Sequence, residues 1–249
     1  MRLSPALVLA TVGTYALLSA EASEIRVLSA AAVQVPVEEI AAAFARDTSH
    51  QVRFEFATAG EVEARVNGGA HPAIVITAEE RSASVVATLG LGAGQVRPLA
   101  TVGIGVAVRR GAPKPDLSSV DAFRQSLRRA ESVAYGDPSR GATTGVHFAK
   151  VLDVLGVADE IRPKTMLAAN GLDVMRRVKS GEIELGVTQI SEILNIDAAA
   201  LVGLLPSELQ KYTTYAAILV DPTDVAAADF IRRLVDEPGR ARFRAAGFQ

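Results

Sequence analysis

The sequence lacks several residue types that define whole classes of protein. Its 249 residues include no cysteine and no tryptophan, which excludes disulfides, thiol catalysis and cysteine-ligated metals. Only 5% of the residues are aromatic, too few to favour a stacking platform for bases or sugars. The three histidines are His50, His71 and His147. Their spacing does not match that of helical metal ligands, so we expect neither a metal site nor a cofactor.

The sequence also has no large excess of positive or negative charge. The 26 Lys and Arg residues against 28 Asp and Glu residues give a net charge of −2. Because phosphate backbones are bound by clustered basic residues, this balance argues against nucleic acid as a partner. Hydrophobic residues make up 49% of the chain, which is enough to bury a proper core.

The first 22 residues have the pattern of an export signal. Arg2 gives a positive start, Leu7 to Leu18 is largely apolar, and Ala20-Glu21-Ala22 is a small-x-small cleavage pattern. The apolar run is shorter than the about 20 residues of a membrane span. An uncleaved anchor is the alternative, but we predict cleavage after Ala22 and a periplasmic protein.

The remaining residues alternate between the two periodicities of strand and helix. The predicted strands are 25–28, 52–56, 74–77, 102–108, 132–135, 183–188 and 214–220. The predicted helices lie around 37–44, 61–67, 123–127, 148–155, 172–178 and 230–235. Alternation of this kind predicts an α/β fold with mainly parallel sheets, in which ligands bind beyond the carboxyl ends of the strands.

Four segments place small or hydroxyl-bearing residues between a strand and a helix. They are 29–33, 58–60, 137–145 and 169–171. Backbone N–H groups are unpaired at helix starts and carry partial positive charge, so such segments suit an anion. Each segment alone is typical of an ordinary N-cap, whereas four in one chain indicate a shared anion site.

The same segments resemble a known family. The runs Val27–Ala32 and Phe56–Gly60, Gly136-Asp-Pro138 with Gly145, Leu185-Gly-Val187 and the ending Phe243…Gly247-Phe248 resemble the periplasmic molybdate-binding proteins of ABC transporters. The resemblance covers nearly the whole exported chain. It implies a type II periplasmic binding protein fold, with two α/β lobes and a ligand cleft between them.

The resemblance also implies lobe boundaries and partners. Val102–Val108 and Tyr212–Val220 would lie near the two strands that cross between the lobes. Residues 23–103 plus 213–249 would then form lobe 1, and residues 104–212 lobe 2. The implied partners are a small anionic ligand and the membrane permease of an ABC transporter, and we expect a monomer.

Several positions depart from the pattern of the molybdate binders. Val33 stands where they have a serine, Gln189 takes the place of a tyrosine, and the serine-rich second segment is Thr58-Ala59-Gly60. A lost hydrogen bond to a charged ligand costs about 1.5–3 kcal/mol, so these changes argue against molybdate itself. The predicted ligand-binding residues are Ser29, Ala30, Thr58, Ala59, Gly60, Arg140, Thr143, Thr144, Asn170, Gly171 and Gln189.

Arg140 adds a cation beside the third segment. A guanidinium there favours a carboxylate or phosphate ligand, with a solvated surface arginine as the alternative. We therefore predict a solute-binding protein for a small anion, either an oxyanion or a small organic carboxylate.

An enzyme is the alternative function. The altered segments resemble a divergent branch of the family that includes aconitate isomerase, notably at Ser132-Val-Ala-Tyr135 and Gln189-Ile-Ser-Glu192. Interconverting cis- and trans-aconitate requires a group that moves a proton between two carbons. His147 and Glu192 are the candidates, and Asp137 is a weaker one because Asp before Pro commonly fixes a turn.

Overall fold

A computed structural model describes residues 23–249 of the chain; the predicted signal peptide, residues 1–22, lies outside the described residues. The strands are β1 Glu24–Ala30, β2 Gln51–Ala57, β3 Ile74–Ala78, β4 Val96–Val108, β5 Val133–Gly136, β6 Thr165–Ala168, β7 Leu185–Gln189, β8 Leu201–Leu204 and β9 Tyr212–Leu219. The α-helices are α1 Gln34–Thr48, α2 Ala59–Asn67, α3 Ser82–Thr88, α4 Val120–Arg129, α5 Thr143–Val154, α6 Ala158–Ile161, α7 Gly171–Ser180, α8 Ile190–Asp197, α9 Val225–Val235 and α10 Glu237–Ala245.

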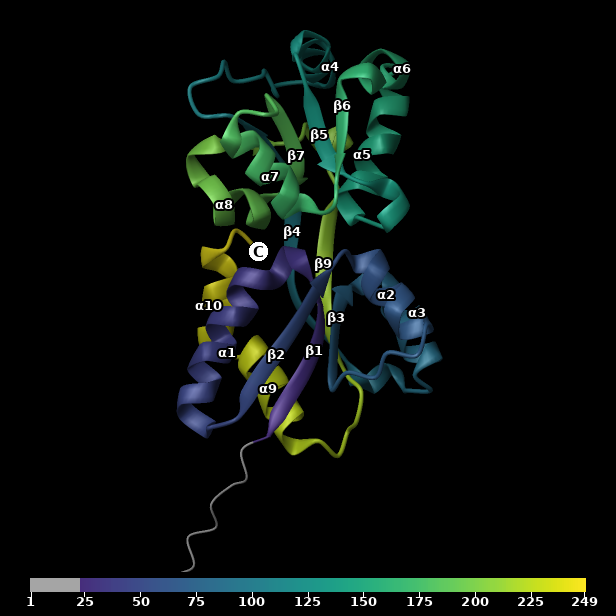
Figure 1. The fold of residues 1–249 in the computed structure, drawn as a ribbon, viewed down its shortest axis with the longest axis vertical. Helices are drawn as coiled ribbons and strands as arrows, with labels where there is room; N and C mark the ends of the chain where they lie inside the picture. The colour runs from purple at the N-terminus through teal and green to yellow at the C-terminus, as the bar shows by residue number, and fades with distance from the viewer. Residues whose placement is uncertain (1–22) are drawn as a thin grey trace, which may run out of the picture.

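The strands form two lobes that share long antiparallel strands. The strand order is β2-β1-β3-β9-β4-β7-β5-β6, with β8 also paired to β4. Figure 1 shows β1, β2 and β3 in one lobe and β5, β6 and β7 in the other. We call these the first and the second lobe.

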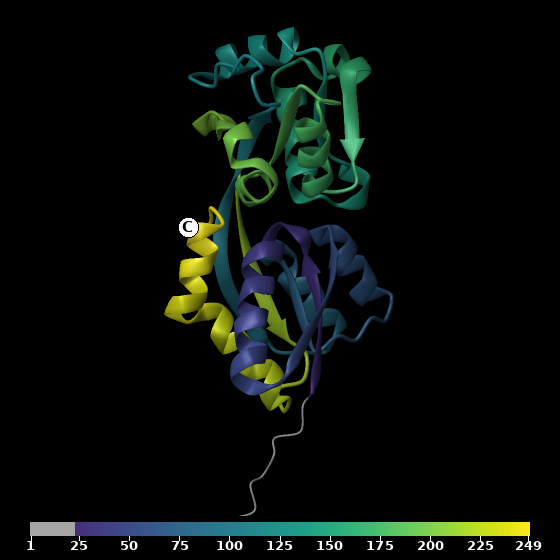
Figure 2. The ribbon, with the colours of Figure 1, turned by 60° about the vertical axis from the view of Figure 1, so that its left-hand side comes forward.

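The strands β4 and β9 run between the lobes (Figure 2). From Val96 to Gly103, β4 pairs with β9, whereas from Ile104 to Val108 it pairs with β7. Because β4 is one continuous strand that belongs to the sheets of both lobes, it connects the two lobes.

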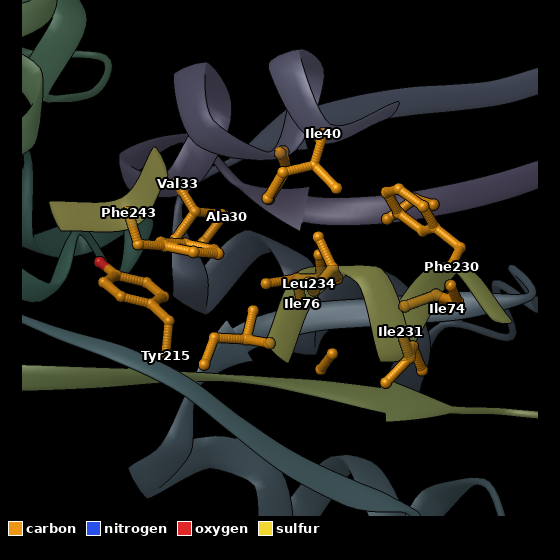
Figure 3. Close-up of a cluster of buried hydrophobic side chains, with 14 of the residues drawn as sticks. Ala30, Val33, Ile40, Ile74, Ile76, Tyr215, Phe230, Ile231, Leu234 and Phe243 are labelled. Atoms are coloured by element: carbon orange, nitrogen blue, oxygen red, sulfur yellow. The ribbon is translucent and has the colours of Figure 1, made fainter. Parts of the chain in front are cut away.

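Apolar clusters cover both faces of the sheet in the first lobe. On one face, α1, α9 and α10 pack against the strands through side chains such as Phe44, Phe230 and Phe243. Figure 3 shows this cluster, with Tyr215 at one end and its hydroxyl pointing away from the apolar interior. On the other face, α2 and α3 bury Val62 and other aliphatic residues.

The second lobe has the same layered arrangement. The helices α4, α5 and α6 cover one face around Phe123 and Phe148, and α7 and α8 cover the other around Met175. Helices on both faces explain why β5 and β7 are buried along their whole length rather than at alternate residues.

The predicted α/β class is confirmed, but the expected parallel pairing holds only within each lobe. The strand β1 pairs in parallel with β2 and β3, and β5 with β6 and β7. All pairings of β4 and β9 are antiparallel, because these strands return the chain between the lobes. Within residues 23–249, no helix is both long and apolar enough to cross a membrane.

Candidate functional site

A cavity lies between the two lobes, at the carboxyl ends of their strands. Its volume is about 30 Å³, two to three times the roughly 10–15 Å³ that a single water needs. Its lining residues are Ala30, Ala31, Ala32, Ala57, Thr58, Ala59, Gly136, Ala142, Thr143, Thr144, Asn170, Gly171, Thr188, Gln189, Glu192 and Tyr215. Small side chains dominate this set, so the backbone is close to whatever occupies the cavity.

Four α-helices begin at this cavity. In two of them the first turn is already capped: the side chains of Thr58 and Asn170 accept hydrogen bonds from backbone N–H groups of α2 and α7. The start of α5 has no side-chain cap hydrogen bond, whereas at the start of α8 the Glu192 carboxyl group accepts a hydrogen bond from the Gln189 N–H. An uncapped helix start presents backbone donors and partial positive charge, so the start of α5 is the end best suited to hold an anion.

Buried polar atoms at the starts of α5 and α8 are left for a ligand. The Thr143 hydroxyl and both polar atoms of the Gln189 amide make no hydrogen bond of ordinary geometry among the described residues, although both side chains lie close enough to the Tyr215 hydroxyl to act on its pKa. Thr143 is 8% exposed and Gln189 is 2% exposed. A buried polar group left unpaired costs about 1–3 kcal/mol, so a ligand that pairs with these atoms gains that energy.

Glu192 is the one charged side chain among the residues that line the cavity. Its Oε2 accepts hydrogen bonds from the Thr188 hydroxyl at 2.5 Å and from the Gln189 N–H at 3.3 Å. Burial raises the pKa of Glu192 to about 7, against the opposite effect of hydrogen bonds from Thr188, Gln189 and the Gly171 N–H. This carboxyl group therefore exchanges its proton near neutral pH.

Gly171 lets Glu192 approach the start of α7. A Cβ atom at this position would collide with Glu192 Oε2 and with Thr188 Oγ1. Glycine is thus required here by the close approach of the carboxyl group to the backbone.

Tyr215 is a cavity residue that the sequence analysis missed. It comes from β9, and its hydroxyl points out of the apolar cluster of the first lobe (Figure 3). The ring of Phe248 packs on it edge to face, with centroids 6.3 Å apart. Burial, followed by the charge of Glu192, raises the pKa of Tyr215 against the opposite effect of the neighbouring Gln189 and Thr143 side chains, so its hydroxyl stays protonated at ordinary pH. The sequence signal for this role was a tyrosine followed by small residues on a strand that was predicted to cross between the lobes.

The lobes touch directly beside the cavity. The N–H of Gly60 donates to the carbonyl of Gly141 at 3.1 Å, and Arg140 forms an ion pair with Glu61 at 2.6 Å. The hydroxyl of Thr58 donates to the Arg140 carbonyl. These contacts join α2 of the first lobe to the segment before α5 in the second lobe.

The structure separates the predicted ligand-binding residues into two groups. Those that line the cavity are Ala30, Thr58, Ala59, Thr143, Thr144, Asn170, Gly171 and Gln189. Those that do not are Ser29, Gly60 and Arg140. The Ser29 hydroxyl is fully buried and donates to the Ala30 carbonyl, while Gly60 and Arg140 make contacts between the lobes. Val33 is fully buried in the core of the first lobe.

Of the acid–base candidates, only Glu192 reaches the cavity. His147 lies on α5, and its Nε2 is 2.8 Å from the Leu209 carbonyl. Asp137 Oδ1 accepts hydrogen bonds from Ser139, which lower the pKa of Asp137. The two residues therefore have structural hydrogen-bond partners outside the site.

The two lobes with a cavity between them define the type II periplasmic binding protein fold. The periplasmic molybdate-binding protein of Azotobacter vinelandii superposes with a TM-score of 0.74, 22% identity and coverage of 90% of this chain and 98% of that one. PEB3 of Campylobacter jejuni, solved with L-phospholactate bound, gives a TM-score of 0.67 at 14% identity, covering 90% and 99% of the two chains. At these identities the likeness establishes the fold.

Residues 25–249 match the family of bacterial extracellular solute-binding proteins. The chain belongs to this family, which confirms the resemblance found in the sequence. It is also 32% identical over 209 residues to the aconitate isomerase of a Pseudomonas species, covering 78% of this chain and 74% of that protein.

Proposed function

We propose that the protein binds a small anion in the cavity between its lobes. The observation that carries this proposal is the set of buried polar atoms of Thr143 and Gln189 without a hydrogen bond at the starts of α5 and α8. The uncapped N-terminus of α5 favours negative charge in the cavity, and neutral donors satisfy the hydrogen-bonding needs of an anion. The balanced composition of the chain fits a site of this kind, which requires no metal and no cluster of cations.

The proposed ligand is a small organic carboxylate or an oxyanion other than molybdate. Val33, which replaces the serine of the molybdate binders, is buried in the core, and Ser29 hydrogen-bonds to the backbone outside the cavity. Neither residue offers a donor to a ligand in this arrangement. The Thr58 hydroxyl, which caps α2, already donates to the Arg140 carbonyl. The side-chain donors that remain for a ligand therefore come mainly from the second lobe.

We further propose where the protein is located, which partner it has and where its lobes begin and end. Membership of an extracellular family supports export to the periplasm with a signal peptide cleaved after Ala22, and a role as the monomeric solute-binding component for an ABC-type permease. The change of partner of β4 after Gly103 supports lobes at residues 23–103 plus 213–249 and 104–212.

Thermal unfolding against a panel of anions tests the binding proposal. The panel contains molybdate, tungstate, sulfate, phosphate, citrate, cis-aconitate and trans-aconitate. A ligand at 100 times its dissociation constant adds about 2.7 kcal/mol to the unfolding free energy, which we expect for one carboxylate or phosphate. If none of these anions raises the unfolding temperature, the proposal is wrong.

Aconitate isomerisation is the second candidate function, and the position of Glu192 favours it. A buried carboxyl group whose pKa is raised to about 7 can take a proton from one carbon and return a proton at neutral pH. On cis-aconitate it would remove a proton from the methylene carbon and return one to the vinyl carbon, which moves the double bond by one position. The Tyr215 hydroxyl, which lines the same cavity, would donate to the carboxylate that gains charge during the shift.

Following trans-aconitate formation from cis-aconitate by NMR tests this candidate. General acid–base catalysis contributes about 10²–10⁴-fold, so Glu192→Gln is expected to lower kcat by at least about 100-fold. His147→Ala is the matched control, because His147 does not line the cavity, and it is expected to keep full activity. If the unaltered protein forms no trans-aconitate, the proposal of an aconitate isomerase activity is wrong.

A further inference from the structure

The cavity offers hydrogen-bond acceptors as well as donors. Gln189 contributes an amide oxygen that has no partner among the described residues, and Glu192 contributes a carboxyl group. A fully ionised anion such as sulfate or succinate has acceptor oxygens only. It can pair with the Thr143 hydroxyl and the Gln189 N–H groups, but it leaves the two acceptors unsatisfied.

The hydrogen bonds to Glu192 leave its carboxyl group with capacity for one further donor. The hydrogen bonds from Thr188 and from the Gln189 N–H both end on Oε2. The Gly171 N–H is a third donor to this carboxyl group. A carboxylate has about four lone-pair sites on its two oxygens, so three donors leave about one site for a ligand. An anion that places a bare oxygen against this group meets charge repulsion, whereas one that places an O–H there forms a charge-assisted hydrogen bond.

We propose that the cavity selects anions that carry a hydroxyl hydrogen over anions of similar shape that carry none. This inference rests on the proposed anion binding and specifies its ligand class. The shared chemistry is an ionised acid with one O–H group, as in a hydroxycarboxylate or in monohydrogen phosphate. The hydroxyl donates to Glu192 or to the amide oxygen of Gln189, while the ionised oxygens accept from Thr143, the Gln189 N–H groups and the start of α5.

The protonation state of Glu192 gives the inference a pH dependence. Glu192 contacts β7 through Thr188 and Gln189, and α7 through the Gly171 N–H; it faces β9 at Tyr215. Of these neighbours only Tyr215 titrates, and burial keeps it protonated by raising its pKa. Below neutral pH, Glu192 carries a proton and can donate to a bare oxygen, so selectivity is expected to grow as pH rises through about 7.

Calorimetric titration with matched pairs of anions tests this inference on the purified full chain. The pairs are malate against succinate and phosphate against sulfate, each at pH 8.5 and at pH 5.5. At pH 8.5 we expect the hydroxyl-bearing member of at least one pair to bind about tenfold tighter or more. Selectivity in the malate pair alone identifies a hydroxycarboxylate, and selectivity in the phosphate pair alone identifies a phosphate.

Two variants test whether Glu192 is the source of the selectivity. Glu192→Gln keeps the side-chain shape and can donate to a bare oxygen, so the two members of the pair should bind within about threefold of each other. Glu55→Gln is the control, because its side chain is 78% exposed on β2, and it should keep the selectivity of the unaltered protein.

Three results overturn the inference. Equal affinity within both pairs for the unaltered protein refutes the selectivity while leaving anion binding intact. Selectivity that persists in Glu192→Gln removes the assignment to Glu192. Absence of binding by all four anions, together with no response in the thermal panel, removes the proposed function and this inference with it.

Discussion

Replacing Gly60 by alanine tests whether closure of the lobes is needed for binding. An alanine Cβ at this position would lie 2.6 Å from the Gly141 Cα and 3.0 Å from the Gly141 carbonyl oxygen. Carbon atoms in contact are about 3.5–4.0 Å apart, so the lobes must separate by roughly 1 Å at this point. The hydrogen bond from the Gly60 N–H to the Gly141 carbonyl, now 3.1 Å, is then broken.

The expected loss follows from the contacts that share this interface. A hydrogen bond contributes about 0.5–1.5 kcal/mol and an exposed ion pair about 0–1 kcal/mol. Losing the Gly60 bond and weakening those of Thr58 and Glu61 to Arg140 costs the closed state about 1.5–3 kcal/mol, or about 10–150-fold in affinity. The first lobe itself is expected to keep its stability, because Gly60 lies in α2 and alanine favours helix over glycine.

Isothermal titration calorimetry with the best anion of the thermal panel measures the change. Gly94→Ala is the matched control, since a Cβ there meets no atom within 4 Å. We expect weaker binding for Gly60→Ala alone, with unfolding temperatures of both unliganded variants within a few degrees of the unaltered protein. An unchanged affinity for Gly60→Ala would refute the idea that binding requires this contact.

Three further predictions concern the donors, Glu192 and the core. Thr143→Val keeps the side-chain shape and removes a hydroxyl that lines the cavity, so calorimetry should show about tenfold or greater loss of affinity, while the unfolding temperature of the unliganded protein stays the same or rises. The pKa of Glu192 is raised from 4.5 to about 7, so folding is favoured by its protonation, and this contribution is lost as pH rises from about 4.5 to 7. In urea titrations, the unfolding free energy of the unaltered protein relative to Glu192→Gln should decline by about 3 kcal/mol over this range. Phe230→Ala, at a side chain fully buried in the first lobe, should lower the unfolding free energy by about 3–5 kcal/mol, while the folded fraction keeps its affinity for the anion.

Elements with strong periodicity were predictable from the sequence. The alternating Val52, Phe54 and Phe56 mark β2, and the apolar spacing of Val37, Ile40 and Phe44 marks α1. The short strands β6 and β8, of four residues each, contain too few residues for a period to show. The helix α10 begins with Glu-Pro-Gly, and these usual helix breakers hide it even though proline is tolerated in a first turn.

The candidate site was predictable to the level of its segments. Small residues between strand and helix indicated which loops meet, because carboxyl ends of parallel strands share one edge of a sheet. The roles of individual side chains depend on contacts far apart in the chain. Arg140 pairs with Glu61 from the other lobe, and Tyr215 reaches the cavity from a crossing strand. No local pattern encodes contacts of this kind.

The crystal structure of the protein with its tightest-binding anion tests the central claim most directly. We predict that the anion lies between the lobes, with its ionised oxygens within hydrogen-bond distance of Thr143 Oγ1 and Gln189 Nε2, which make no hydrogen bond of ordinary geometry among the described residues. An anion bound elsewhere on the molecule, with these two atoms still unpaired, would contradict it.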